Sequence, residues 1–228
     1  MRLPVTARTS VLRALRDEVR ARCPRGRVVL AVDGVDGAGK TIFADGLAEA
    51  FAEEGTDVFR ASIEGFHRPR AERPTRGEDS GRGRYEDSYD YSSFRRVLID
   101  PFREGSRTAA SIGFQLAAWD AVRDAPVEAR WVTGPADAVL VVDGVFLHRP
   151  QLADIWDWSV WLDTPPDVAS ARMALRDGSD PDPDAPGNRY RRRGQESYMA
   201  EVDPRNRAAA VIDNTDPESP RRVLTGSA

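Results

Sequence analysis

The stretch GVDGAGKT at residues 34–41 decides how this chain folds. An apolar, valine-rich run at 27–32 precedes it, and residues 41–54 after it carry Phe43, Leu47 and Phe51 at helical spacing. Glycines let successive backbone N–H groups turn inward around an anion, and the following helix directs its positive end toward the same point. The spacing, between a strand and a helix, is typical of the P-loop that binds the phosphates of a nucleoside triphosphate.

Lys40 is the only lysine among 33 basic residues, so the other 32 are arginines. A GC-rich coding sequence explains why arginine replaces lysine elsewhere in the chain. The one position that keeps lysine is therefore informative. A bulky guanidinium cannot replace a compact ammonium group in a tight phosphate cradle. The sequence therefore predicts the outer phosphates of a nucleoside triphosphate at Lys40 and Mg²⁺ at the hydroxyl of Thr41. The predicted nucleotide-binding residues of the loop are Gly34, Asp36, Gly37, Ala38, Gly39, Lys40 and Thr41.

The composition restricts the class of protein. With 40% hydrophobic and 31% charged residues, the chain is expected to be globular, not disordered or membrane-embedded. The start at Met1 has no apolar secretory core, and Cys23 is alone, which excludes an internal disulfide and argues against a cysteine-based zinc site. A net charge of -4 gives no support for nucleic-acid binding. We expect a cytoplasmic protein without nucleic-acid or membrane partners, and a homo-oligomer stays open.

Strand and helix patterns alternate along most of the chain. The expected helices are 10–23, 41–54, 88–100 (closed by Pro101), 165–176 and 190–201, and the expected strands are 27–32, 57–63, 136–142, 158–163 and 209–212, with short strands within 107–133. This alternation predicts an α/β fold, a P-loop three-layer sandwich with a parallel sheet, helices on both faces and a small lid. We expect a single domain, 1–228, with an N-terminal helix in 1–26.

Two segments are expected to be loops. Residues 64–88 contain glycine and proline between arginines, and residues 177–187 are acidic and proline-rich. The first is predicted to lie on the side of the phosphate acceptor. The second begins the predicted lid, 177–196. The arginines of the first loop are Arg68, Arg70, Arg73, Arg76, Arg82 and Arg84.

A carboxylate facing magnesium is expected at the end of a neighbouring strand. Asp143 follows four apolar residues, and Asp163, after another strand, is its rival. We favour Asp143, because a buried strand would carry it to the phosphate side of the sheet.

Several classes of P-loop protein are excluded. The guanine-reading motif of common GTPases needs a lysine that this chain lacks, and the signature of ABC-type ATPases is absent. Small-molecule kinases remain, whose chemistry needs a base near the acceptor hydroxyl and arginines over the transferred phosphoryl group.

Four segments, in order, resemble the uridine kinase branch of the P-loop kinases, which includes phosphoribulokinase and pantothenate kinase relatives. They are VDGVDGAGKT at 32–41, SIEGFHR at 62–68, VVDGVFL at 141–147 and VIDN at 211–214. The resemblance covers about residues 27–215. It implies an ATP- and Mg²⁺-dependent phosphotransferase.

The resemblance also implies roles for individual residues. Glu64 stands where the family has an aspartate that takes the acceptor proton and helps to organise magnesium, so the metal site would comprise Thr41, Asp143 and Glu64. Arg172 and Arg176 share a helix face and would close over the ATP phosphates, with Arg191, Arg192 and Arg193 as further candidates. Asp213 and Asn214 would border the adenine. The implied acceptor-binding residues are Phe66, His67, Tyr85, Asp87 and Asp90.

The leading hypothesis is transfer of the ATP γ-phosphoryl group to a hydroxyl of a nucleoside, uridine or cytidine, with Glu64, Lys40 and Arg176 as the catalytic residues. A sugar or pantothenate-like acceptor is the alternative within the class, because Glu64 and His67 depart from the nucleoside pattern. Thymidylate kinase ranks lower, because the chain lacks that family's motif after the second strand. A P-loop nucleotide sensor without phosphotransfer is the alternative outside the class.

Overall fold

The computed structural model of the chain describes residues 2–73, 80–105 and 112–224. Arg76 and residues 107–111, which carried expectations above, lie outside the described residues. The strands are β1 (Arg27–Gly34), β2 (Val58–Ser62), β3 (Phe114–Gln115), β4 (Trp119–Asp120), β5 (Ala125–Pro126), β6 (Trp131–Val132), β7 (Ala138–Gly144), β8 (Trp158–Asp163), β9 (Ala210–Asp213) and β10 (Arg221–Val223). The α-helices are α1 (Ala7–Arg22), α2 (Lys40–Ala52), α3 (Gly81–Asp87), α4 (Tyr91–Phe94), α5 (Asp100–Glu104), α6 (Pro166–Asp177), α7 (Arg189–Val202) and α8 (Pro204–Arg207).

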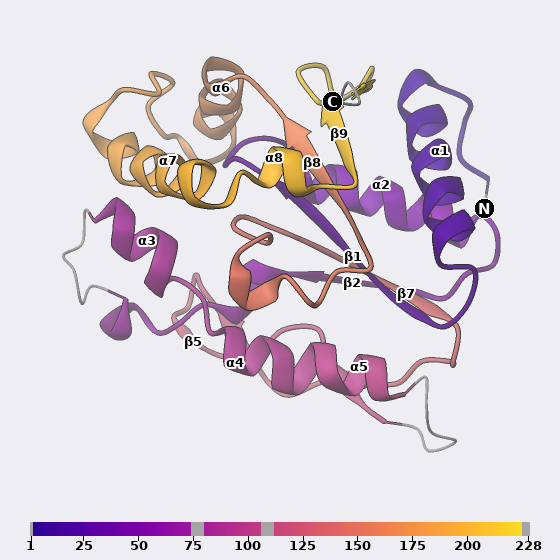
Figure 1. The fold of residues 1–228 in the computed structure, drawn as a ribbon. Coiled ribbons are helices and arrows are strands. Elements are labelled where there is room, and N and C mark those ends of the chain that lie inside the picture. The colour runs from indigo at the N-terminus through magenta and orange to yellow at the C-terminus, as the bar shows by residue number, and fades with distance from the viewer. Residues whose placement is uncertain (1, 74–79, 106–111, 225–228) are drawn as a thin grey trace.

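The main sheet runs β10-β9-β8-β1-β7-β2. All neighbours pair in parallel except β10, which is antiparallel to β9. Helices cover both faces of this sheet, as Figure 1 shows. The predicted α/β class, with a mainly parallel sheet between helical layers, is confirmed.

Alternate residues of the central strand β1 point into two separate cores. Val28, Leu30 and Val32 pack with residues of α1 and α2, whereas Val29 and Ala31 pack with the layer that contains α4 and α5. Because side chains alternate across a strand, the apolar run at 27–32 supplies both faces of the sheet. The run is therefore buried along its whole length.

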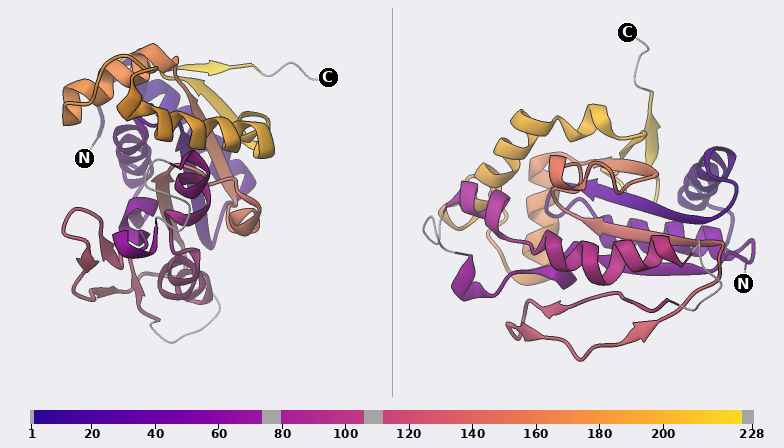
Figure 2. Two further views of the ribbon diagram at one scale, coloured as in Figure 1. Left: turned by 90° about the vertical axis from the view of Figure 1, so that its left-hand side faces the viewer. Right: turned by 60° about the horizontal axis from the view of Figure 1, so that its bottom comes forward.

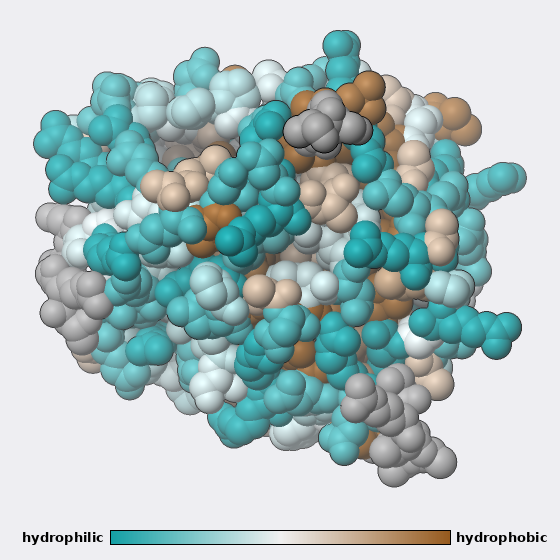
Figure 3. All heavy atoms as spheres, viewed as in Figure 1, coloured by the Kyte–Doolittle hydropathy of each residue, from teal (hydrophilic) through white to brown (hydrophobic). Residues whose placement is uncertain are grey.

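The short strands predicted within 107–133 form two small two-stranded sheets, β3 with β6 and β4 with β5. They lie outside the main sheet, along the layer of α4 and α5 (Figure 2). The face seen in Figure 3 is largely hydrophilic, with apolar residues in small separate areas. None of the helices in the described part of the chain is both long and apolar enough to cross a membrane.

Two expected boundaries were wrong. The helix expected to close at Pro101 continues through a π-helical turn, η3 (Arg95–Ile99), into α5. Pro101 lies where the π-helical turn passes into α5, and its missing N–H removes one backbone hydrogen bond at this junction. The loop expected at 64–88 contains helix α3, which the hydroxyl of Ser80 caps by accepting a hydrogen bond from the Gly83 N–H at 3.0 Å.

An ion pair attaches α1 to α2. Arg13 donates to both oxygens of Glu53, at 2.8 and 3.0 Å, and these hydrogen bonds lower the pKa of Glu53 from 4.5 to about 2. A lowered carboxyl pKa stabilises the fold above pH 4.5, and this contribution is lost as the pH falls toward 2. We therefore expect Glu53→Gln to lower the urea midpoint at pH 7 and to converge on wild type as the pH falls below 4.5.

Urea unfolding between pH 7 and pH 3 measures this convergence. Glu54→Gln is the matched control, because Glu54 is the next residue and is half exposed. A difference between Glu53→Gln and wild type that stays constant over this range would contradict the assignment.

Candidate functional site

The P-loop lies between the carboxyl end of β1 and the start of α2. Gly37 and Gly39 have φ angles of +79° and +87°, which side chains other than glycine's rarely adopt. A Cβ on Gly37 would lie 2.2 Å from the carbonyl oxygen of Ala169 in α6. Glycine at this position is thus required by both the turn and the neighbouring helix.

Interactions within and across the loop fix its shape. The Lys40 Nζ donates to the carbonyl oxygen of Val35 at 2.8 Å, and the Ala38 N–H donates to the same oxygen at 3.1 Å. The Asn214 side-chain amide, from beyond β9, donates to the Ala38 carbonyl at 2.7 Å. The predicted residue Asn214 therefore contacts the loop directly.

A cavity of about 490 Å³ opens over the P-loop. Of the residues predicted to bind nucleotide, metal or acceptor, the ones on its wall are Asp36, Gly37, Gly39, Lys40, Thr41, Glu64, Asp143, Arg172, Arg176 and Asn214. Gly34, Ala38 and Asp213 are not among the lining residues. Asp213 instead accepts a hydrogen bond from the Thr215 N–H at 2.9 Å.

Asp143 and Thr41 meet at the edge of the sheet. The Thr41 hydroxyl donates to Asp143 Oδ2 at 2.8 Å, and Arg60 of β2 donates to Asp143 Oδ1 at 2.8 Å. No local sequence pattern indicates this contact of Arg60. Asp163, the rival carboxylate, instead accepts from Arg205 at 3.0 Å and does not line the cavity.

The chemistry of these donors fits Mg²⁺. No group of three histidine, cysteine, aspartate or glutamate side chains that could hold a metal occurs among residues 2–73, 80–105 and 112–224. A P-loop site does not need one, because Mg²⁺ favours one or two protein oxygens together with substrate phosphates and water. The buried Asp143 carboxylate and the Thr41 hydroxyl form such a pair.

We expect Asp143→Asn to raise the Mg²⁺ concentration for half-maximal activity by about tenfold or more. The amide keeps the shape of the side chain but removes its negative charge. A Mg²⁺ titration of activity at saturating ATP measures the shift. Asp163→Asn is the control, and equal titrations for wild type and Asp143→Asn would remove Asp143 from the metal site.

Glu64 lies in η1 (Ile63–Phe66), a 3-10 turn at the end of β2. His67 Nε2 is 2.7 Å from its Oε2, and the Tyr89 hydroxyl donates to its Oε1 at 2.5 Å. Burial opposes ionisation, but the hydrogen bond and charge of His67 and the hydroxyl of Tyr89 outweigh it, so the pKa of Glu64 is lowered. Its side chain remains 54% exposed toward the cavity, as a proton acceptor for a bound hydroxyl would need.

The other predicted acceptor-binding residues are placed differently. Phe66 and Tyr85 are buried in the core, 1% and 3% exposed, where they pack edge-on against Phe94 and Phe146. Asp90 caps α4 by accepting from the Ser93 N–H at 3.0 Å. Asp87 ends α3 and does not line the cavity. Of this group, His67 contacts Glu64 directly, and the rings of Phe66 and Tyr85 are packed in the core.

The predicted lid arginines differ in how they are held. Arg172 donates to the carbonyl oxygens of Asn214 and Thr215, both at 2.9 Å, and its Nη1 is buried without a hydrogen-bond partner among the described residues. Arg176 is 67% exposed beside Asp177. Of the arginine triplet, Arg192 contacts Asp184 and Glu196, whereas Arg191 lies near the P-loop carboxylate of Asp36.

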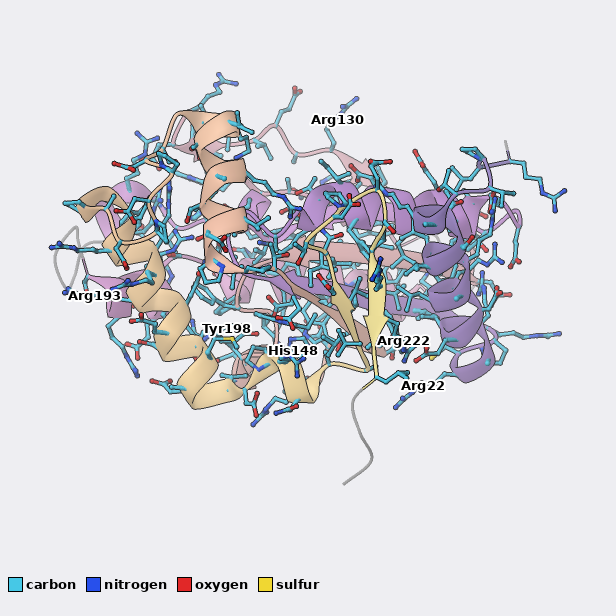
Figure 4. The ribbon with its side chains drawn as sticks, turned by 90° about the horizontal axis from the view of Figure 1, so that it is seen from above. Arg22, Arg130, His148, Arg193, Tyr198 and Arg222 are labelled. Carbon is cyan, nitrogen blue, oxygen red and sulfur yellow. The ribbon has the colours of Figure 1, made fainter. Side chains whose placement is uncertain are left out.

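A buried polar network, which the sequence did not indicate, ties the P-loop strand to α7. Asp33 Oδ2 accepts from His148 Nδ1 at 2.8 Å and from the hydroxyl of Tyr198 at 2.5 Å. Figure 4 shows Tyr198 and His148 next to each other beside α7, with Arg193 toward the other end of the helix. His148 Nε2 is also 2.9 Å from the Ser159 hydroxyl. Although this geometry matches a serine-hydrolase relay, Ser159 is only 6% exposed, so the network is structural.

Several solved structures have a fold similar to that of this chain. The sequence matches no model of a known protein family. A possible uridine kinase from Bacillus stearothermophilus is similar in structure, with a TM-score of 0.62, 23% identity, and coverage of 88% of this chain and 100% of that one. A candidate fructose transport system kinase from Silicibacter has a TM-score of 0.60 and 25% identity, with coverage of 86% and 94%. Phosphoribulokinase from Rhodobacter spheroides has a TM-score of 0.51 and 17% identity, with coverage of 88% and 76%.

These similarities extend over 86–88% of this chain. The predicted resemblance to the uridine kinase-like group of P-loop kinases is therefore confirmed at the level of the fold.

Proposed function

We propose that this protein is an ATP-dependent small-molecule kinase of the uridine kinase-like group, which transfers the γ-phosphoryl group to a hydroxyl of its acceptor. The observation that carries the proposal is the shared cavity. Lys40 from the P-loop, Asp143 from the end of β7 and Glu64 from the end of β2 all line it. Phosphoryl transfer needs a phosphate cradle, a metal-binding carboxylate and a base close to one another.

In the proposed reaction, the acceptor oxygen forms a bond to Pγ as the bond from Pγ to the bridging oxygen of ATP breaks. The electron pair of the broken bond goes to the β-phosphate of ADP, and the acceptor proton goes to Glu64 Oε. Lys40 and the P-loop N–H groups bind the phosphates, and Asp143 and Thr41 would hold Mg²⁺. When bound, Mg²⁺ neutralises charge on the phosphate oxygens.

Glu64 can accept that proton because its carboxylate is ionised at neutral pH, with a pKa that His67 and Tyr89 hold below the ordinary 4.5. Tyr89 and His67 each contact one of the two carboxylate oxygens. These contacts fix the orientation of the carboxylate that would receive the proton. Arg172 and Arg176 line the same cavity and would bind the ATP phosphates. Positioned groups of this kind lower the barrier without further reorganisation.

A nucleoside of the uridine or cytidine type remains the leading acceptor, and the fold similarity to a possible uridine kinase supports it. A sugar is the second candidate, and one observation favours it. Tyr85 and Asp90, predicted to hold the nucleoside, are occupied by core packing and by a helix cap. A sugar needs hydroxyl contacts but no stacking surface for a base.

A coupled assay of ADP release tests the proposal across nucleosides, sugars and pantothenate. We expect ADP release that requires one of these acceptors and Mg²⁺. Tight ATP binding with no acceptor-dependent turnover anywhere in the panel would favour a nucleotide sensor instead.

A further inference from the structure

The P-loop carboxylate of Asp36 is shared by two elements that lie far apart in the sequence. Arg84 of α3 donates to Asp36 Oδ2 at 2.5 Å, and Gln195 of α7 donates to the same oxygen at 3.0 Å. Asp36 and Arg84 side chains are only 18% and 17% exposed. The acceptor-side segment and the predicted lid therefore both contact the phosphate loop through one residue.

Close packing holds α3 and α7 in this arrangement. A Cβ on Gly81 of α3 would lie 2.3 Å from the Cβ of Arg193, and one on Gly194 of α7 would lie 3.0 Å from the carbonyl oxygen of Gly81. Two glycines thus allow the backbones of these helices to approach closely. Helix α3 lies beside α7 in Figure 1. Arg84 is carried on a helix that cannot move independently of α7 without breaking this contact.

The surroundings of Asp36 are strongly positive. Burial opposes its ionisation, but the charges of Arg84, Lys40 and Arg191 outweigh it and lower the pKa of Asp36. These cations come from α3, from the P-loop and from α7. Asp36 and Lys40 line the cavity together with Glu64, and Arg84 contacts this wall through its hydrogen bond to Asp36.

The guanidinium of Arg84 has unused capacity to donate. Its Nε is buried without a hydrogen-bond partner among the described residues, and only Nη2 donates to Asp36. Guanidinium binds phosphate through paired N–H donors, as it binds carboxylate. Gln195 offers a second donor at the same point.

From this geometry we infer that Arg84 is a further catalytic residue, which donates hydrogen bonds to the transferred phosphoryl group and has Asp36 as its resting partner. Gln195 and Asp36 are positioning residues that hold the guanidinium over the P-loop. Arg84 takes no covalent part, and the bonds formed and broken are those of the proposed phosphotransfer, on which this inference rests.

Binding of ADP with aluminium fluoride, which mimics the transferred phosphoryl group, gives the direct test. We expect Arg84→Ala to weaken binding of the ADP–fluoride complex at least about tenfold, with ADP alone bound within about threefold of wild type. In turnover, kcat should fall by about 10²–10³, the scale of removing one preorganised donor. Arg84→Lys should recover part of this loss and Arg84→Gln should not, although glutamine can still donate to Asp36.

Arg82→Ala is the matched control, because Arg82 lies on the same helix, is half exposed and pairs with Glu86 and Glu201 instead. Thermal unfolding checks that each variant folds, and Arg84→Gln replaces Arg84→Ala if the latter does not. The inference is overturned if Arg84→Gln, like Arg82→Ala, has the kcat and the affinity for the ADP–fluoride complex of the wild type. Arg84 would then have only a structural role. A wild-type enzyme that transfers no phosphoryl group to any acceptor would instead overturn the proposed function.

Discussion

Lys40→Ala is expected to reduce acceptor-dependent phosphotransfer by about 10³-fold or more, with the fold retained. The ammonium group is the only lysine charge in the chain, and it lies in the P-loop on the wall of the cavity. Removing one preorganised donor to a developing charge typically costs about 10²–10³ in kcat, and Lys40 would also bind ground-state phosphates. Steady-state kinetics with ATP and the identified acceptor measure the loss.

Lys40→Arg separates charge from geometry in the same assay. We expect it to stay close to the alanine variant, because the guanidinium is planar and larger than the cradle allows. Circular dichroism and thermal unfolding should show both variants folded. Turnover of Lys40→Ala within a few-fold of wild type would contradict the placement of ATP phosphates at the P-loop.

Glu64→Gln is expected to lower kcat by about 10²–10⁴, the usual contribution of a general base. The amide is nearly isosteric and can still contact His67 and Tyr89, so binding of ATP and acceptor should change little. Because the pKa of Glu64 is lowered, wild-type activity should fall only below pH 4.5, as the carboxylate is protonated. The variant should lack this acidic limb.

Glu72→Gln is the control for Glu64→Gln, because Glu72 is an exposed carboxylate eight residues along the same segment. It should retain wild-type kcat. If Glu64→Gln keeps activity within a few-fold of wild type, another group takes the acceptor proton and Glu64 has no such role.

The part of the site built from consecutive residues could be predicted from the sequence. The P-loop consists of glycines, a lysine and a threonine that are close together in the sequence. The valine-rich composition of the preceding run predicts a buried strand. Asp143 could also be predicted, because parallel strands end at one edge of the sheet and Asp143 follows an apolar run. These features need only local pattern and a general rule of topology.

The rest depends on contacts between distant residues. Arg60 and Asp143 are 83 residues apart in the sequence, and Arg84 and Asp36 are 48 apart. No local sequence pattern predicts either contact. Helix α3 contains two glycines, which lower helix propensity, and it forms because α7 packs against it. Packing likewise decides that Tyr85 lies in the core, although its neighbours in sequence suggested a binding surface.

Transfer of label from [γ-³²P]ATP tests the central claim most directly, with the acceptor that releases most ADP in the coupled assay. We predict that the label appears in the phosphorylated acceptor, one equivalent for each ADP formed, and that Glu64→Gln slows formation of this product by about 10²–10⁴. Label found only in inorganic phosphate, or retained in ATP with every acceptor, would contradict the account.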